Sequence, residues 1–160
     1  MWFKHTVPRR QNAAFTLVEI MIVVSIIALL AAIAVPSFLR ARVRSQNSKF
    51  INALRVASDA IDLYTTEHPG EFPADVTRGI VPPELVRYLD ETFDWTARTP
   101  IGGRWDWDFN VMSVTAAVSI VDPPDVERMT EIDRTYDDGN LTAGRFQRLA
   151  VDRYAVIIQR

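Results

Sequence analysis

A long apolar stretch near the N-terminus constrains this chain more than any other feature. Residues 15–35 read FTLVEIMIVVSIIALLAAIAV, and Pro36 follows directly. At ~1.5 Å per residue, a helix over this stretch is roughly 31 Å long, enough to cross a hydrocarbon core of about 30 Å. The sequence therefore predicts a transmembrane helix over residues 15–35.

Glu19 is an acidic residue inside this apolar stretch, where an unpaired carboxylate is costly. Two interpretations stay open. Glu19 lies near one end of the stretch, so its side chain can reach headgroups and water. Alternatively, cleavage between Ala14 and Phe15 would leave a free amine on Phe15, which pairs with Glu19 of a neighbouring subunit. Such a pair is strong in an apolar bundle and would set the register between subunits.

The motif around this position carries a family resemblance. Residues 14–19 read AFTLVE ahead of an apolar helix, which resembles the leader of type IV pilins and type II secretion pseudopilins. In that family a prepilin peptidase cuts before the phenylalanine and methylates the new amine. The glutamate is then fifth and a proline twenty-second, as Glu19 and Pro36 are when counted from Phe15. The family usually has glycine before the cut, where this chain has Ala14.

The resemblance implies a structural subunit of a type II secretion pseudopilus or a type IV pilus-like filament. It implies a single-pass protein of the inner membrane, with its head outside the cytoplasm, that assembles into a periplasmic or surface filament. The implied partners are the prepilin peptidase and methyltransferase, copies of this chain, other pseudopilins and secretion platform proteins. Phe15 would supply the amine, Glu19 the counter-charge, and Pro36 a kink that loosens the helix.

A secretory signal peptide is the rival interpretation of the N-terminus. Residues 1–14 form a basic leader without acids, and residues 32–34 read AIA, which is typical of a signal cleavage site. The apolar region of a signal peptide is usually shorter than this one. Charge alone leaves the orientation open, because basic residues flank both ends of the stretch. The resemblance, rather than the charge, places the C-terminal part outside the cytoplasm.

Beyond Pro36 the helical pattern continues as an amphipathic helix. Apolar residues recur at spacings of three and four, which gives one buried stripe: Phe50, Leu54, Ala57, Ile61 and Tyr64. The run HPG at residues 68–70 ends the helix. We expect a leader over 1–14, a membrane or filament-core helix over 15–35, an amphipathic spine over 36–68 and a globular head over 69–160.

The head is predicted to hold a small antiparallel sheet and short helices. Residues 70–83 read as loop, 83–89 as a short helix and 99–103 as a turn. Residues 105–109 (WDWDF) alternate, which predicts a strand with its aromatic side chains on one face and Asp106 and Asp108 on the other. The aromatic face favours the core over a sugar site. A second strand over 111–121 follows a turn at Asn110, residues 125–136 form a helix capped by Asp125, and 154–158 form the last strand. The fold class is α+β, with the long helix packed on the sheet.

Hard oxygen ligands cluster after the helix predicted at 125–136. They are Asp133, Asp137, Asp138 and Asn140, a group that suits calcium although its spacing fits no EF-hand. The major pseudopilin of type II secretion is similar in using a calcium-bound loop in place of a disulfide. The alternative is a helix stop at Gly139 flanked by turn-forming residues.

Composition bounds the other function classes. The chain has no cysteine, which excludes disulfides. Many adhesive type IV pilins close a C-terminal loop with a disulfide, so this absence tilts the resemblance towards the pseudopilins. Its formal charge of −2 does not favour nucleic-acid binding. With two histidines and no nucleophile, phosphate or metalloprotease motif, we expect no enzyme. The alternative function is a membrane-anchored periplasmic binding or catalytic domain whose anchor only resembles that of a pilin.

Overall fold

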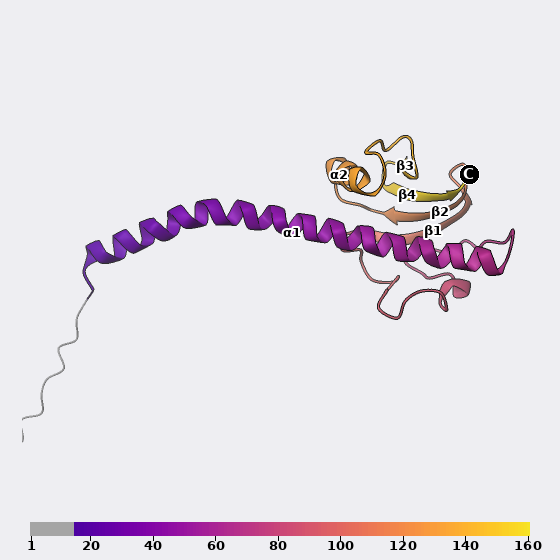
Figure 1. Cartoon of the computed structure of the whole chain (residues 1–160), viewed down its shortest axis with the longest axis horizontal. Helices are drawn as coiled ribbons and strands as arrows, with labels where there is room; N and C mark the ends of the chain where they lie inside the picture. The colour runs from indigo at the N-terminus through magenta and orange to yellow at the C-terminus, as the bar shows by residue number, and fades with distance from the viewer. Residues whose placement is uncertain (1–14) are drawn as a thin grey trace, which may run out of the picture. The chain divides into compact units, whose positions relative to one another are not determined.

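The computed structural model describes residues 15–160, so the leader and Ala14 lie outside the described residues. Two compact units meet between Ala41 and Arg42, and each is described by itself. The chain belongs to the predicted α+β class (Figure 1). Its elements follow in this order: α1 (Leu17–Glu67), the 3₁₀ helix η1 (Pro83–Leu85), β1 (Arg104–Val111), β2 (Val114–Val121), α2 (Val126–Tyr136), β3 (Phe146–Ala150) and β4 (Arg153–Gln159).

Helix α1 confirms the long helix that the sequence predicts. Its buried residues all lie from Asn47 onward and include the whole predicted apolar stripe. The helix ends where His68 donates its backbone N–H to the carbonyl of Tyr64 at 2.9 Å. Gly70 follows with a φ of 82°, a left-handed conformation that glycine adopts without strain.

The four strands form one antiparallel sheet with the order β1-β2-β4-β3. One face of this sheet carries the large side chains, and the C-terminal part of α1 and helix α2 pack against it. Phe50 of α1 stacks on Trp105 of β1 with ring centroids 5.4 Å apart. Trp105 and Trp107 are both buried, so the core interpretation of the aromatic face is confirmed.

The β1–β2 hairpin turns two residues later than predicted. Asn110 belongs to β1, and Met112 and Ser113 form the turn between the strands. Both turn residues have positive φ, 50° and 63°, which suits the twist of a two-residue hairpin. The prediction of a turn at Asn110 was therefore wrong. Nothing in the sequence indicated the true turn, because methionine and serine are not the usual residues for this conformation.

Two other elements differ from the prediction. The helix expected over 83–89 is reduced to η1, and the chain continues through turns in which Tyr88 bonds back to Leu85 at 2.9 Å. Strand β3 was not predicted, because its sequence FQRLA lacks a clear alternation. Helix α2 begins as expected: the side chain of Asp125 accepts the backbone N–H of Arg128.

Candidate functional site

The start of α1 is a reciprocal cap formed by Thr16 and Glu19. The Glu19 backbone N–H donates to the Thr16 hydroxyl at 3.2 Å. In return, the Thr16 backbone N–H and hydroxyl each donate to Oε2 of Glu19 at 2.8 Å. This is a capping box, in which the first and fourth residues satisfy each other's backbone donors. The sequence signal, threonine three residues before glutamate, was present but was not used in the prediction.

This cap leaves room for a second partner of Glu19. Among residues 15–160, Oε1 of Glu19 has no hydrogen-bond donor within reach. The side chain of Phe15 is 82 % exposed and lies just before the cap. Cleavage before Phe15 would leave the amide of Thr16 intact, so the capping box can exist in a processed chain. The structure therefore places Phe15 and Glu19 together at the helix start.

The part of α1 up to Ala41 is apolar and exposed. This helix is long and apolar enough to cross a membrane, and none of its most apolar window is buried. One further polar residue of this stretch, Ser25, donates its hydroxyl to the carbonyl of Met21 at 2.7 Å. The Ser25 hydroxyl is thus satisfied within the helix itself, as a hydrocarbon environment requires. Such a surface needs a partner of lipid or protein.

Pro36 lies inside α1, and the helix continues on both sides of it. Proline has no backbone N–H, so the carbonyl of Ala32 loses its partner within the helix. The predicted kink at Pro36 stays a prediction.

Three of the four predicted calcium ligands come together after α2. Single carboxylate oxygens of Asp133, Asp137 and Asp138 lie within 4.8 Å of one another. Asp133 is 0 % exposed, and neither of its carboxylate oxygens forms a hydrogen bond of ordinary geometry among the described residues, although the backbone N–H groups of Gly139 and Asp138 lie close enough to lower its pKa in part. Burial, and after it the charges of Asp138 and Asp137, raise the pKa of Asp133 to about 6. A buried carboxylate whose nearby donors are so poorly aligned is unusual, and a further partner would stabilise its charged form.

The remaining oxygens of this acidic cluster are already committed to shaping the loop. Oδ2 of Asp137 accepts the backbone N–H groups of Arg145 and Phe146. Oδ1 of Asp138 accepts the N–H of Asn140 at 2.7 Å. The side-chain oxygen of Asn140 accepts from Thr142, so Asn140 is bound into a turn of its own. The loop is thereby held in a shape that keeps the three carboxylates close.

The second face of the sheet holds a buried ion network that sequence reasoning missed. The guanidinium of Arg153 on β4 forms ion pairs across β2 with two carboxylates of β1. Its Nη2 lies 2.9 Å from Oδ2 of Asp106, and its Nη1 pairs with Oδ1 of Asp108. The hydroxyl of Ser119 also donates to Asp108. Asp106 is only 4 % exposed, and burial raises its pKa to about 6 despite the charge of Arg153. Alternation along β1 predicted the face of these aspartates but not their burial.

Comparison with known proteins places the N-terminal motif in a wider group. Residues 9–35 match the model of a protein family described as "Prokaryotic N-terminal methylation motif". The chain is 54 % identical over 39 residues to the type IV major pilin protein PilA of Myxococcus xanthus, a match covering 24 % of this chain and 18 % of that protein. It is 28 % identical over 112 residues to the type II secretion system core protein G of Klebsiella michiganensis, covering 66 % of this chain and 76 % of that protein. No solved structure gives a significant match.

These matches extend beyond the leader, and the second of them covers 66 % of this chain. The chain has the N-terminal methylation motif and is homologous to a type IV pilin and to a pseudopilin of type II secretion. The first match spans less than a fifth of the pilin, whereas the second spans about three quarters of the secretion protein. Neither relative is named as an enzyme. The homology supports a role as a structural pilin or pseudopilin subunit.

Proposed function

We propose that this chain is a subunit of a type II secretion pseudopilus or a type IV pilus-like filament. The observation that carries the proposal is the exposed apolar surface of α1 up to Ala41, which begins near the capped Glu19 and overlaps the methylation motif at residues 9–35. In the inner membrane, lipid covers this surface. In the filament, the same surface packs against the helices of other subunits.

Processing between Ala14 and Phe15 prepares the subunit for assembly. A prepilin peptidase removes the leader, and methylation follows on the amine of Phe15. That amine then pairs with Glu19 of a neighbouring subunit, while Oε2 of Glu19 keeps its bonds to Thr16. The pair is stabilised because each charge alone is costly in an apolar environment. Pro36 gives the helix the local freedom to bend past its neighbours.

The partners follow from this assembly route. They are the peptidase and methyltransferase, further copies of this chain, other pseudopilins and the secretion platform in the inner membrane. The alternative is a membrane-anchored binding or catalytic domain. Such a domain needs only an apolar anchor, so the charge on Glu19 has no role in it.

Two substitutions of Glu19 test the proposal, because they separate capping from charge pairing. Glutamine keeps the acceptor that a capping box needs but loses the charge. Glu19→Gln and Glu19→Ala should therefore both be processed normally, and both should lose filament assembly when counted by electron microscopy. Ser25→Ala is the matched control and should assemble normally, because Ser25 bonds only within its own helix. Normal filaments from Glu19→Gln would contradict the charge pair.

We also propose that the acidic cluster holds a calcium ion. The buried carboxylate of Asp133, which lacks a well-aligned donor, favours this second function, with Asp137 and Asp138 as further ligands and Asn140 at the edge. Calcium prefers six to eight hard oxygens, so backbone carbonyls and water would complete the shell. The ion would offset two of the three carboxylate charges and fix the loop between α2 and β3.

Thermal unfolding of the full chain in detergent tests the calcium site. Calcium at about 100 times its Kd should stabilise the head by ~2.7 kcal/mol and raise the Tm by several degrees. Asp133→Asn should abolish this shift, whereas Asp152→Asn, at an exposed residue, should keep it. An equal Tm with calcium and with a chelator would contradict the site.

A further inference from the structure

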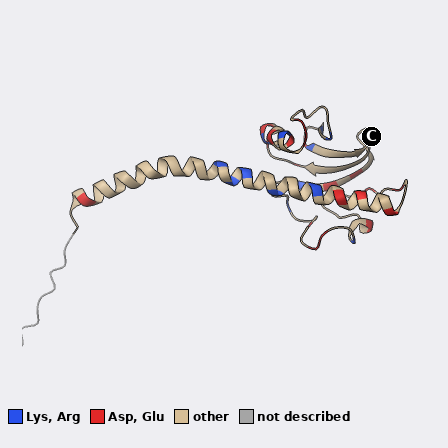
Figure 2. Ribbon diagram, viewed as in Figure 1, with Lys and Arg blue, Asp and Glu red and all other residues tan. Residues whose placement is uncertain are grey.

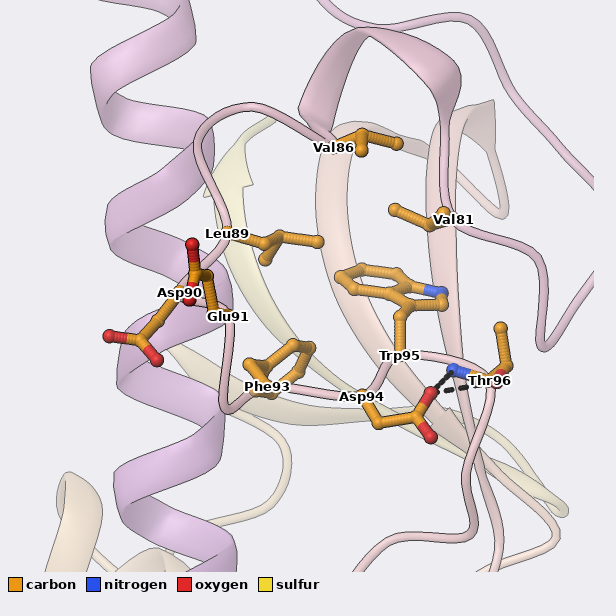
Figure 3. A pocket seen from close by; sticks show the side chains of 9 residues that line it. All are labelled: Val81, Val86, Leu89, Asp90, Glu91, Phe93, Asp94, Trp95 and Thr96. Atoms are coloured by element: carbon orange, nitrogen blue, oxygen red, sulfur yellow. Dashed lines mark hydrogen bonds between the residues drawn. The ribbon is translucent and has the colours of Figure 1, made fainter.

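A shallow pocket lies in the segment between η1 and β1. Its volume is about 260 Å³, and we call it the acidic pocket. Its apolar lining consists of Val81, Val86, Leu89, Phe93 and Trp95, and its rim carries Asp90, Glu91 and Asp94. Figure 3 shows the side chains of Leu89, Phe93 and Trp95 facing the same hollow, with Asp90 and Glu91 on one side and Asp94 on another.

The rim is negatively charged and has no cationic partner. Among residues 15–160, none of its three acids takes part in an ion pair. Two of them are fixed by the chain: Oδ1 of Asp90 accepts the N–H of Thr92 at 2.7 Å, and Oδ1 of Asp94 accepts that of Thr96 at 2.9 Å. The hydroxyl and N–H of each threonine lower the pKa of these carboxyls, so both stay charged.

The lining also contains an unsatisfied donor. Trp95 is 2 % exposed, and its indole Nε1 has no acceptor among the described residues. A buried N–H without an acceptor costs about 1–3 kcal/mol unless a partner supplies one. What the pocket offers a partner does not include this buried N–H; it is an apolar floor and a negative rim, which together are the complement of an apolar segment flanked by cations.

Such a segment lies on α1 of the same sequence. Residues 38–44 read FLRARVR, and we call them the basic segment. Leu39 and Val43 are 52 % and 37 % exposed and lie one helical turn apart on the same face. At ~100° per residue, Arg40 and Arg42 lie about 80° to either side of this apolar ridge. Figure 2 shows Lys and Arg in blue along the middle of α1. Arg40, Arg42 and Arg44 form no ion pair within residues 15–160.

We propose that the basic segment of one subunit docks in the acidic pocket of a second copy of this chain. The inference rests on the proposed filament function and names one contact within it. Leu39 and Val43 enter the pocket, and Arg40 and Arg42 face the acids of the rim. The two surfaces are different parts of one chain, so each subunit offers one pocket and one segment. Repetition of such a heterologous contact gives an open assembly rather than a closed dimer.

A lipid surface is the competing occupant of the basic segment. Anionic headgroups would neutralise the arginines. They would not fill the apolar pocket or neutralise its negative rim. A second copy accounts for both unpaired surfaces together, and for this reason we favour it.

Paired cysteines test the contact, because the natural chain has none. Val43→Cys marks the segment and Val86→Cys marks the pocket, and both side chains are partly exposed. In filaments of the full chain, the double variant should give a ladder of cross-linked multimers under a short bismaleimide. Each single variant should give none, and a mixture of the two single variants should give dimers only. This mixture separates contact between subunits from contact within one chain.

Charge reversal supplies the matched energetic test. Glu91→Lys in the rim should lower the ladder yield roughly tenfold, and Arg42→Glu in the segment should do the same. Combining both reversals in one chain should restore the yield. Glu71→Lys makes the same chemical change at an exposed acid outside the pocket and should have no effect.

The outcomes separate this contact from the filament proposal. Filaments without a ladder would overturn the docking contact alone. Absence of filaments from the wild-type chain would overturn both. If Arg42→Glu weakens binding to anionic vesicles while the double cysteine variant gives no ladder, the occupant is the lipid headgroup and the docking contact is wrong.

Discussion

The two parts of helix α1 differ in where their apolar surface finds a partner. From Leu17 to Ala41 the helix is apolar on nearly every side, and its large side chains are exposed. From Arg42 to Glu67 the helix is apolar along one stripe, and the head covers that stripe. A one-sided stripe indicates a partner within the chain, whereas an all-round apolar surface requires one from outside. The second part of the helix is therefore stabilised by the head of its own chain, whereas the first part exposes an apolar surface that only another molecule can cover.

Removal of the first part should have the largest effect. A chain that begins at Arg42 keeps every buried residue of the core, so it should be soluble, monomeric and folded in water. A chain with residues 15–160 should need detergent or lipid. Size-exclusion chromatography and thermal unfolding of both chains measure the difference. Aggregation of the shorter chain in water would contradict the division at Ala41.

A core substitution should have the next largest effect. Trp107 is 0 % exposed and donates its indole N–H to the carbonyl of Pro73 at 3.0 Å. Trp107→Ala should lower the free energy of unfolding of the head by ~3–5 kcal/mol. Ile26→Ala, in the exposed part of α1, should change it by less than about 0.5 kcal/mol. Denaturant unfolding in detergent compares them, and equal losses would show that the two parts are not independent.

The pH dependence of the head should show a smaller effect. The pKa of Asp133 is raised from 3.8 to about 6, so folding favours the protonated carboxyl. The stability that this proton contributes is fully present below pH ~4 and is lost as the pH rises through about 6. The pKa of Asp106 is also raised to about 6, so its proton contributes stability with the same sign and over nearly the same pH range.

Without calcium, the head should therefore unfold at a higher temperature at pH 5 than at pH 7. Asp133→Asn should reduce this difference, because asparagine carries no charge at either pH. Asp152→Asn serves as the control. A pH profile unchanged by Asp133→Asn would show that the buried carboxylate has a donor or a cation that stabilises its charged form.

The sequence predicts those features of this fold that depend on local pattern. The apolar stretch and the stripe from Phe50 to Tyr64 repeat at helical spacing, so the helix and its buried face follow directly. Asp125 caps α2 through a bond three residues away, which is equally local. The capping box of Thr16 and Glu19 is just as local, and the motif alone is enough to predict it.

Features that depend on distant partners were not predictable. Asp106 and Asp108 were predicted only to share the face opposite the aromatic side chains. Their burial was not predictable, because nothing near them reveals that Arg153, far along the chain, covers them. Strand β3 forms because β4 offers it an edge, not because its own residues alternate. The acidic pocket likewise joins residues whose proximity the sequence does not reveal, except that Asp90, Glu91 and Asp94 occur without an intervening basic residue.

The most direct test of the central claim is the mass and the N-terminal residue of the protein recovered from membranes. The account predicts a chain that begins with N-methylated Phe15, since only cleavage after Ala14 creates the amine that pairs with Glu19. A chain beginning at Val35 would identify an ordinary secreted protein and remove Glu19 from the mature molecule. A chain that still begins at Met1 would make α1 a static anchor and contradict assembly through the Phe15 amine.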